Sequence, residues 1–340
     1  MSKRRLSENQ KRRIQLHQQR KQEQALEQEH VDITTLSHSQ QIGRIIAHYG
    51  RSADVIAENH QIYSCDIRQN LPALVTGDNV VFELTATASG IIAALLPRIS
   101  LLSRNIASGE LRAMAANVTQ VFVVIAPEPE VNWLVLDRYL VGLEQCQLAA
   151  GIVLNKSDLF GTKHLEEMLT IYKKIGYPIF KTCTQQPETL TTLTAALVDQ
   201  TSIFIGQSGV GKSSLIQVLL PHEHLRTGAL SERTRLGSHT TSTTRLYTFP
   251  HGGYLIDSPG IRDFGLNSIE LRDLARGFIE FQPHLGHCKF KSCHHLNEPE
   301  CAIHQAVEQG DITAQRLASY QELFHNLQEM AKDYAKNNST

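Results

Sequence analysis

Two different rhythms of apolar and polar residues divide this chain. Between residues 41 and 104, short apolar runs alternate with turn signals such as Tyr49-Gly50, Leu71-Pro72 and Gly77-Asp78. Short runs bounded by glycine and proline predict β-strands. The predicted strands are Gly43–His48, Ala53–Glu58, Gln61–Ser64, Asn79–Leu84 and Gly90–Leu95. Five short strands favour a small barrel of the OB-fold type, although an SH3-like barrel would leave nearly the same pattern.

From Asn117 onward the pattern changes to a longer alternation of apolar strands and helical stretches. The predicted strands are Val121–Ala126, Gly151–Leu154, Pro178–Phe180, Ser202–Ile205 and Tyr254–Asp257. The predicted helices between them are Leu134–Gln147, Lys163–Ile175, Thr189–Val198 and Lys212–Leu219. This alternation predicts a mostly parallel sheet covered by helices, and a helical run (Ser268–Phe281) and a polar helix (Thr313–Ala335) follow it.

A glycine-rich segment between a predicted strand and a predicted helix fits the phosphate-binding pattern G-x-x-x-x-G-K-[ST]. It runs Gly206-Gln207-Ser208-Gly209-Val210-Gly211-Lys212-Ser213, and Ser214 follows. The backbone N–H groups of such a turn can surround phosphate, and the helix N-terminus adds a positive field. We expect Lys212 to reach the β- and γ-phosphates and Ser213 to bind Mg²⁺.

A second motif, N-K-x-D, selects the base. Asn155-Lys156-Ser157-Asp158 follows directly after a predicted strand. The carboxylate of Asp158 can accept hydrogen bonds from N1–H and the 2-amino group of guanine, whereas adenine offers neither donor. The two motifs together predict GTP and GDP as ligands. Because N-K-x-D precedes the phosphate loop, the usual order of GTPase motifs is circularly permuted.

A third motif, Asp257-Ser258-Pro259-Gly260, fits D-x-x-G at the end of a predicted strand. We expect Gly260 to offer its N–H to the γ-phosphate, so that loss of this phosphate releases the loop. Many GTPases carry a glutamine after this motif to orient the attacking water, but Ile261 stands there in this chain. Intrinsic hydrolysis should therefore be slow unless another group helps.

The polar segment 237–244 precedes that motif and is either a plain Thr/Ser loop or the first switch. As a switch, Thr240 or Thr241 would close on the γ-phosphate and Mg²⁺, and Thr241 is the magnesium ligand that we assign. His239 titrates near neutral pH and is our candidate for assisting hydrolysis.

Three of the six cysteines crowd into one short segment. Cys288, Cys293 and Cys301, together with His295, offer three thiolates and an imidazole, enough for a closed tetrahedral Zn²⁺ site with a structural role. The spacing is not that of a C₂H₂ finger, and other histidines compete as ligands, namely His284, His287, His294 and His304. Reduced cysteines without a metal are the alternative.

Length and charge limit the number of domains and the kinds of partner that the chain can have. A chain of 340 residues is long enough for two or three domains. Its apolar runs are too short to span a membrane, and its first residues lack the apolar core of a signal peptide, so we expect a cytoplasmic protein. Residues 1–30 hold eight Lys and Arg against four Glu, which leaves 25 basic and 30 acidic residues elsewhere. The basic start is either a solvated helix or loose tail, or an arm that neutralises nucleic-acid phosphates.

The permuted motifs, the preceding barrel and the cysteine cluster closely resemble the RsgA (YjeQ) family of GTPases that act in small-subunit ribosome biogenesis. The resemblance covers nearly the whole chain and includes Gly43-Arg44-Ile45, Leu101-Leu102-Ser103-Arg104, Ala115-Ala116-Asn117-Val118 and Asp257-Ser258-Pro259-Gly260-Ile261-Arg262. It implies a multidomain α/β chain with an arm (1–36), an OB-fold barrel (37–104), a circularly permuted GTPase domain (105–266) and a zinc-binding, mostly helical domain (267–340).

The resemblance also implies function. The family acts late in maturation of the small ribosomal subunit, which strongly stimulates its GTP hydrolysis, and its zinc ligands correspond to Cys288, Cys293, His295 and Cys301. We expect 16S rRNA as a partner, no DNA or membrane, and a monomer. The GTP state would grip the rRNA and hydrolysis would loosen the grip.

Two positions depart from the family pattern in the first switch. Ser238 replaces an arginine, which removes a possible rRNA or phosphate contact, and Ser242 replaces a threonine but keeps the hydroxyl. The fifth GTPase motif is weakly marked, at Thr182-Cys183. Two other functions fit the motifs, a GTPase switch for a protein client and a nucleotide-binding module that does not turn over.

Overall fold

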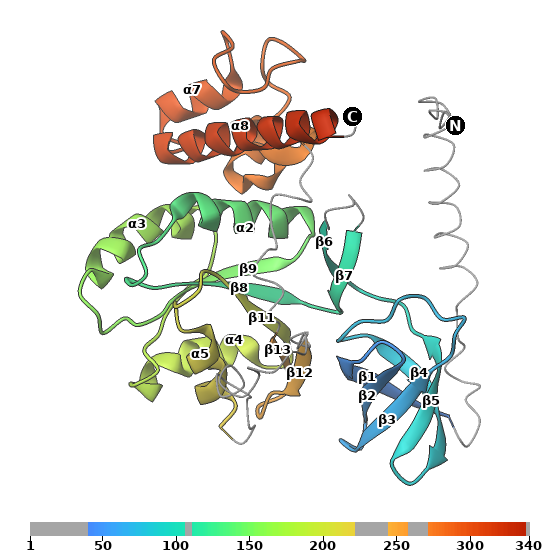
Figure 1. Ribbon diagram of the computed structural model, residues 1–340. Coiled ribbons are helices and arrows are strands. Elements are labelled where there is room, and N and C mark those ends of the chain that lie inside the picture. Colours follow the sequence, from blue (N-terminus) through green and yellow to red (C-terminus); the bar gives the residue numbers. More distant parts are fainter. Residues whose placement is uncertain (1–39, 106–110, 222–243, 258–270, 338–340) are drawn as a thin grey trace, which may run out of the picture. The chain divides into compact units, whose positions relative to one another are not determined.

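The computed structural model describes residues 40–105, 111–221, 244–257 and 271–337 of the chain (Figure 1). The chain divides into two compact units between Ile99 and Ser100. Among the described helices, none combines the length and the apolar character that crossing a bilayer requires.

The first unit is a closed barrel of five strands. They are β1 (Gln40–His48), β2 (Ser52–Ala57), β3 (Ile62–Ile67), β4 (Asn79–Ala86) and β5 (Ser89–Leu95). The strands pair in the cyclic order β1-β2-β3-β5-β4-β1, in which β3 and β5 are parallel and all other pairs are antiparallel. The barrel is OB-like, as the sequence predicted.

Alternating inward side chains fill this barrel, among them the fully buried Ile45, Val55 and Phe82. Gly43 is required at its position, because a Cβ there would lie 2.4 Å from Val55 Cγ1. At one end the buried Asp78 carboxylate accepts from Arg98 Nε at 2.6 Å, so its burial is compensated.

The second unit contains a sheet in the order β10-β9-β8-β11-β13-β12. All neighbours are parallel except β12 and β13, which are antiparallel. The strands are β8 (Gln120–Ile125), β9 (Ala149–Leu154), β10 (Ile179–Lys181), β11 (Thr201–Ile205), β12 (Arg245–Thr248) and β13 (Tyr254–Asp257). A separate hairpin of β6 (Leu101–Asn105) and β7 (Leu111–Ala116) precedes them.

Helices cover both faces of this sheet. Figure 1 shows α2 (Trp133–Gln145) and α3 (Thr162–Ile175) on one face and α4 (Thr191–Leu197) and α5 (Lys212–Leu219) on the other. A short 3-10 helix, η2 (Pro187–Leu190), leads into α4. The central strands are buried on both faces, which explains why β11 is apolar or small at every position.

The C-terminal part of the second unit is helical. It consists of two 3-10 helices, η5 (Leu271–Gly277) and η6 (Ile279–His284), an irregular loop that carries the cysteines, α7 (Ala302–Gln309) and the long α8 (Ala314–Asn337). Within the described residues, the predicted helical run from Ser268 to Phe281 consists of two 3-10 helices and is not one continuous helix. Phe278 adopts an extended backbone that separates η5 from η6, and Pro283 lies inside η6, where it removes a backbone donor.

Candidate nucleotide site and metal centre

The predicted nucleotide motifs meet at one edge of the sheet. N-K-x-D follows β9, the glycine-rich loop follows β11, and Asp257 is the last residue of β13. Carboxyl ends of parallel strands point to the same edge, which is where open α/β sheets bind their ligands. The permutation therefore changes the order of the motifs along the chain but leaves them together in space.

The glycine-rich loop has the backbone of a phosphate cradle. Gly206 and Gly211 both have positive φ angles, of 137° and 93°. A Cβ on Gly206 would lie 2.2 Å from Val124 O, and one on Gly211 would lie 2.4 Å from Asn155 Nδ2, so no other residue fits. Lys212 Nζ donates to the carbonyl oxygens of Gly206 (2.8 Å) and Gln207 (2.5 Å), which holds its charge over the loop.

The helix behind this loop begins with exposed hydroxyl side chains. α5 begins at Lys212, no side chain caps its N-terminus, and Ser213 and Ser214 in its first turn are exposed. Its N-terminal N–H groups and the Ser213 hydroxyl can therefore serve a phosphate and its cation. Ser208 and Gly209 are exposed as well, whereas Val210 is anchored in the core.

The turn of the N-K-x-D motif (155–158), which is predicted to read guanine, is bonded directly to the glycine-rich loop. The buried Asn155 donates from Nδ2 to Val210 O at 2.9 Å. Lys156, in the left-handed region with a φ of 55°, donates from Nζ to Glu128 O at 2.9 Å. The N-K-x-D turn and the glycine-rich loop are thus fixed relative to each other.

Thr182 and Cys183, which follow β10, brace the same turn. Thr182 Oγ1 donates to Asn155 Oδ1 at 3.1 Å, and Thr182 O accepts from Ser157 N at 3.1 Å. The Cys183 thiol donates to Asp158 Oδ1 at 3.1 Å. Burial, reinforced by the bond to Asp158, raises the pKa of the Cys183 thiol, so it remains a donor. The sequence marked these two residues weakly, and their position after a strand next to β9 was the available signal.

Several predicted residues cannot be placed. His239, Thr240, Thr241 and Gly260 lie outside the described residues, as do Ser238 and Ile261. Asp257 is described, is half-buried, and pairs with Arg245 in the β12–β13 ladder.

The four predicted zinc ligands converge in the helical C-terminal part of the second unit (271–337), called the C-terminal domain below. The ligand atoms of Cys288, Cys293, His295 and Cys301 all lie within 4.8 Å of one another. His295 Nδ1 lies 3.5, 3.6 and 3.4 Å from the sulfurs of Cys288, Cys293 and Cys301, and the sulfurs of Cys288 and Cys301 are 3.9 Å apart. A tetrahedral zinc ion has N–S edges of about 3.6 Å and S–S edges of about 3.8 Å. A disulfide needs about 2.05 Å. The spacing therefore fits a metal.

Backbone donors and burial act on the protonation of the cysteine ligands in opposite directions. Backbone N–H groups of Ala302 and His295 donate to the sulfurs of Cys288 (3.3 Å) and Cys293 (3.4 Å). Burial raises the pKa of the Cys293 thiol to about 12 and lowers the pKa of His295. Without a cation the Cys293 thiol is therefore protonated at neutral pH and the imidazole is neutral, and a zinc ion would displace the thiol proton on binding.

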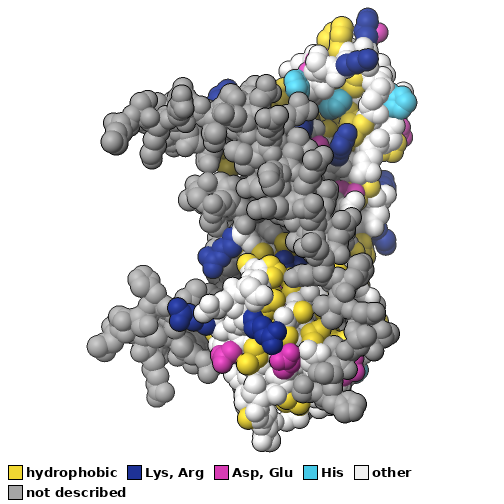
Figure 2. All heavy atoms as spheres, turned by 90° about the vertical axis from the view of Figure 1, so that its right-hand side faces the viewer, with side chains coloured by type: hydrophobic (Ala, Val, Ile, Leu, Met, Phe, Trp, Pro, Cys, Tyr) yellow, Lys and Arg dark blue, Asp and Glu magenta, His cyan; other side chains and the backbone are white. Residues whose placement is uncertain are grey.

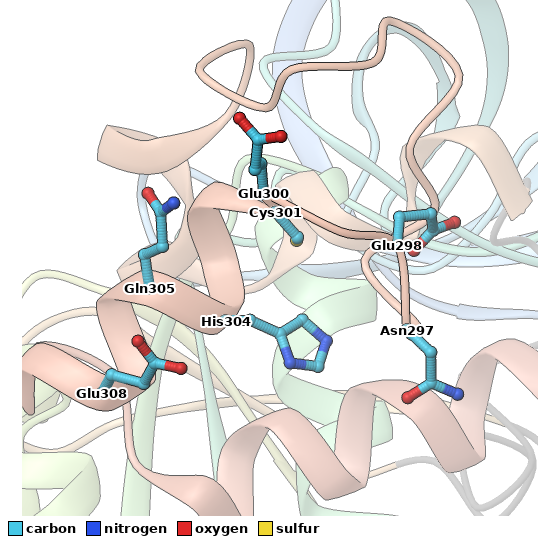
Figure 3. A pocket seen from close by; sticks show the side chains of 7 residues that line it. All are labelled: Asn297, Glu298, Glu300, Cys301, His304, Gln305 and Glu308. Atoms are coloured by element: carbon cyan, nitrogen blue, oxygen red, sulfur yellow. The ribbon is translucent and has the colours of Figure 1, made fainter.

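The competing histidines lie elsewhere. The His304 ring bonds through Nε2 to Leu296 O at 2.7 Å, and the His294 ring packs against Phe324. A hollow beside Cys301 (Figure 3) is lined by His304 and by three glutamates, of which Glu298 accepts from the N–H groups of His294 and Leu296 at 2.9 Å. Burial alone would raise the pKa of Glu298, but these donors lower it to about 2. This carboxylate braces the cysteine loop.

The parallel sheet carries the glycine-rich loop and the N-K-x-D turn bonded to it, in permuted order along the chain. These features define a circularly permuted P-loop GTPase. Comparison with known proteins identifies the family. The model of the RsgA GTPase family matches residues 95–267. The chain belongs to this family of GTP-hydrolysing proteins.

Two relatives carry the same name, "Small ribosomal subunit biogenesis GTPase RsgA". The protein from Chromohalobacter salexigens is 48% identical over 294 residues, which cover 85% of this chain and 86% of that protein. The protein from Azotobacter vinelandii is 43% identical over 340 residues and covers 97% of this chain and 99% of its own.

Two solved structures share the fold. YjeQ from Thermotoga maritima superimposes with a TM-score of 0.70 at 32% identity and covers 85% of this chain and 98% of its own. YloQ, a circularly permuted GTPase, gives a TM-score of 0.69 at 26% identity over 86% of this chain and 96% of its own.

Proposed function

We propose that this GTPase binds the small ribosomal subunit and assists its late maturation. Relatives more than 40% identical over nearly the whole chain are small-subunit biogenesis GTPases. The hydrogen bond from Asn155 to Val210 carries the proposal for GTP, since it joins the base-reading turn to the phosphate loop. Among the four common ribonucleoside triphosphates, GTP alone offers both donors that Asp158 requires.

In this proposal residues 206–214 and 155–158 hold GTP or GDP. Lys212 turns from its present carbonyl partners to the β- and γ-phosphates, because a phosphate is the stronger acceptor. Ser213 and Thr241 bind the Mg²⁺ that accompanies the nucleotide, with Asp257 beside them. Gly260 donates its N–H to the γ-phosphate.

The catalytic cycle follows from Ile261, whose side chain cannot orient water. Hydrolysis by the protein alone is slow, and the small subunit stimulates it by fixing His239 and Thr240 against the nucleotide. The GTP state binds 16S rRNA, and hydrolysis drives release. The protein works in the cytoplasm as a monomer and needs neither DNA nor a membrane.

The cysteine cluster binds one structural Zn²⁺ in this proposal. A closed Cys₃His set leaves no open position for a substrate. The zinc would hold the irregular loop between η6 and α7, where regular secondary structure gives little support.

The test is multiple-turnover GTP hydrolysis by the purified protein alone, with small subunits and with large subunits. We expect slow turnover that small subunits alone raise many-fold. Stimulation by neither subunit, or equally by both, would refute the assignment of the small subunit and leave the GTPase in place.

Two variants sharpen this assay. Xanthine carries an oxygen where guanine has its 2-amino group, so Asp158→Asn should lose GTP hydrolysis and gain subunit-stimulated XTP hydrolysis.

His239→Ala should reduce the stimulated rate by about 100-fold or more without changing GTP affinity. A His239→Ala protein with the full stimulated rate would remove His239 from the mechanism.

A further inference from the structure

The C-terminal domain shares a core with helix α2 of the GTPase domain. Val141 of α2 is fully buried in the hydrophobic cluster of the C-terminal domain, together with Leu274, Phe278 and Phe281. A Cβ on Gly277 would lie 2.4 Å from Val141 Cγ1, so η5 approaches α2 as closely as a backbone can. This is a packed interior and differs from the wet contact typical of mobile domains.

Hydrogen bonds flank the shared core on the C-terminal half of α2. Gln145 Nε2 donates to Asp273 O at 3.1 Å, and Gln282 Nε2 donates to Glu144 Oε1 at 3.1 Å. The α2 helix therefore contacts both 3-10 helices of the C-terminal domain.

A buried ion network lies at the centre of this interface. The guanidinium of Arg316, on α8, is 1% exposed, and it contacts Asp137 Oδ1 of α2, which is fully buried. The same guanidinium donates from Nε to Glu280 Oε1 at 2.5 Å and lies 4.5 Å from the Phe278 ring centroid. Burial disfavours the charge of Arg316, but Asp137 and Glu280 raise the pKa of this guanidinium above its ordinary value, so it stays charged. Burial raises the pKa of Asp137, and the charge of Arg316 and the hydrogen bond from Tyr172 oppose that shift.

Such a network specifies geometry more than it adds stability. Desolvation of buried charges offsets most of their attraction, whereas a displacement that separates them leaves uncompensated charges. Few arrangements of the C-terminal domain on α2 satisfy Arg316, Asp137 and Glu280 at once.

Helix α3, which follows the N-K-x-D turn in the chain, also contributes a residue to this network. Tyr172, near the end of α3, donates to the same Asp137 Oδ1 at 2.8 Å, and its ring stacks on Trp133 of α2 with centroids 5.9 Å apart. α3 begins at Thr162, four residues after Asp158.

The segment that leads into α2 also contacts the nucleotide motifs. Glu128 O accepts from Lys156 Nζ at 2.9 Å, and Pro129 lies 3.5 Å from where a Cβ on Gly209 would be. Both helices thus connect the nucleotide site with Arg316.

We propose that α2 and α3 couple nucleotide occupancy to the C-terminal domain through the Arg316–Asp137–Tyr172 network. This coupling goes beyond the proposed function and does not depend on the ribosome. A nucleotide that orders the N-K-x-D turn and the segment before α2 reduces the motion of α2 and α3. Through the network it also reduces the motion of α8. Because coupling is reciprocal, docking of the C-terminal domain also tightens guanine-nucleotide binding.

The test is hydrogen–deuterium exchange of the full chain, with and without GDP and Mg²⁺. In the unmodified protein we expect GDP to slow exchange of the α8 amides by about fivefold or more, in addition to those of the phosphate loop. If GDP protects the loop and leaves α8 unchanged, the proposal is wrong.

Variants of the network residues test whether the coupling passes through Arg316. Arg316→Met alone would leave two buried carboxylates without their cationic partner. The variant of choice is therefore the triple variant Asp137→Asn, Glu280→Gln and Arg316→Met, which keeps the side-chain volumes nearly unchanged and removes all three charges. We expect GDP to protect the loop in this variant but not α8, and GDP affinity to fall several-fold.

Tyr172→Phe removes only one hydroxyl and serves if the triple variant does not fold. It should reduce the protection of α8 by at least half. The exposed Arg276→Met, on the same domain, is the matched control and should behave as the unmodified protein does. Full GDP-induced protection of α8 in both network variants would overturn the proposal.

Discussion

The Cys183 thiol holds the carboxylate of Asp158, the residue that we propose reads the base. Asp158 is exposed, so without a donor its side chain would rotate and lose entropy on binding guanine. The buried Cys183 is itself held, since its N–H donates to Thr189 Oγ1 at 2.8 Å. The thiol therefore presents Asp158 to the ligand in a nearly fixed position.

We predict that Cys183→Ala weakens GDP binding by about two- to tenfold, the range that one hydrogen bond gives. Cys183→Ser keeps a donor of similar reach and should bind as the unmodified protein does. The measurement is titration with GDP and with inosine diphosphate, which lacks the 2-amino group. In the proposed site Asp158 bonds that group, so Cys183→Ala should narrow the preference for GDP over inosine diphosphate. An equal loss for both ligands would mean a merely structural role.

Sequence patterns identified residues whose chemistry depends on local spacing. Glycines at 206, 209 and 211 and the turn at 155–158 could be predicted because each motif is a continuous segment with one backbone geometry. Arg316 could not. Its partner Asp137 is 179 residues away, and both look like ordinary charges on amphipathic helices until packing buries them.

Among elements, those with a strong period were predicted well. The prediction Tyr254–Asp257 matches β13, and Lys212–Leu219 matches α5, since buried strands and amphipathic helices have continuous patterns. The hairpin β6–β7, strand β12 and helix α7 were missed. Each of these elements is too short for a clear hydrophobic period, and its apolar side chains are buried by neighbouring elements.

The cysteine loop is the element with the least regular structure of its own. Between His284 and Ala302 the described chain has no helix or strand, and its carboxylates only brace the turns. We predict that Cys293→Ser abolishes zinc binding and lowers the unfolding temperature of the C-terminal domain by about 5 °C or more. GDP affinity should fall by no more than a few-fold, the extent of the coupling through α2.

Elemental analysis and scanning calorimetry measure these effects together. Cys146→Ser, at the C-cap of α2 and outside the cluster, is the matched control and should keep its zinc. A Cys293→Ser protein with one zinc per chain, or an unmodified protein with none, would contradict the assignment.

On the scale of the whole molecule, the surface charge of the barrel argues against a purely electrostatic grip by this domain. Residues 40–99 carry four arginines and five acidic residues. Figure 2 shows basic and acidic side chains interspersed on this face, and Arg68 pairs with Glu83 at 2.9 Å. OB-like barrels that bind nucleic acid usually combine a basic groove with stacked aromatics, and the exposed aromatic side chain here is Tyr49. Much of any phosphate neutralisation must then come from other segments.

The basic arm is the segment that could supply it, although it lies outside the described residues. Residues 1–30 carry eight Lys and Arg against four Glu. Each phosphate contact contributes roughly 0.7 to 0.9 to the slope of log affinity against log salt. We predict that removing residues 1–30 weakens binding to small subunits and flattens this slope by several units, while GTP hydrolysis without subunits stays the same. A full-length variant with the eight basic residues changed to glutamine separates charge from length, and it should reproduce the truncation. If both variants keep the original slope, the arm makes no phosphate contacts, and shape recognition by the folded domains would have to account for binding.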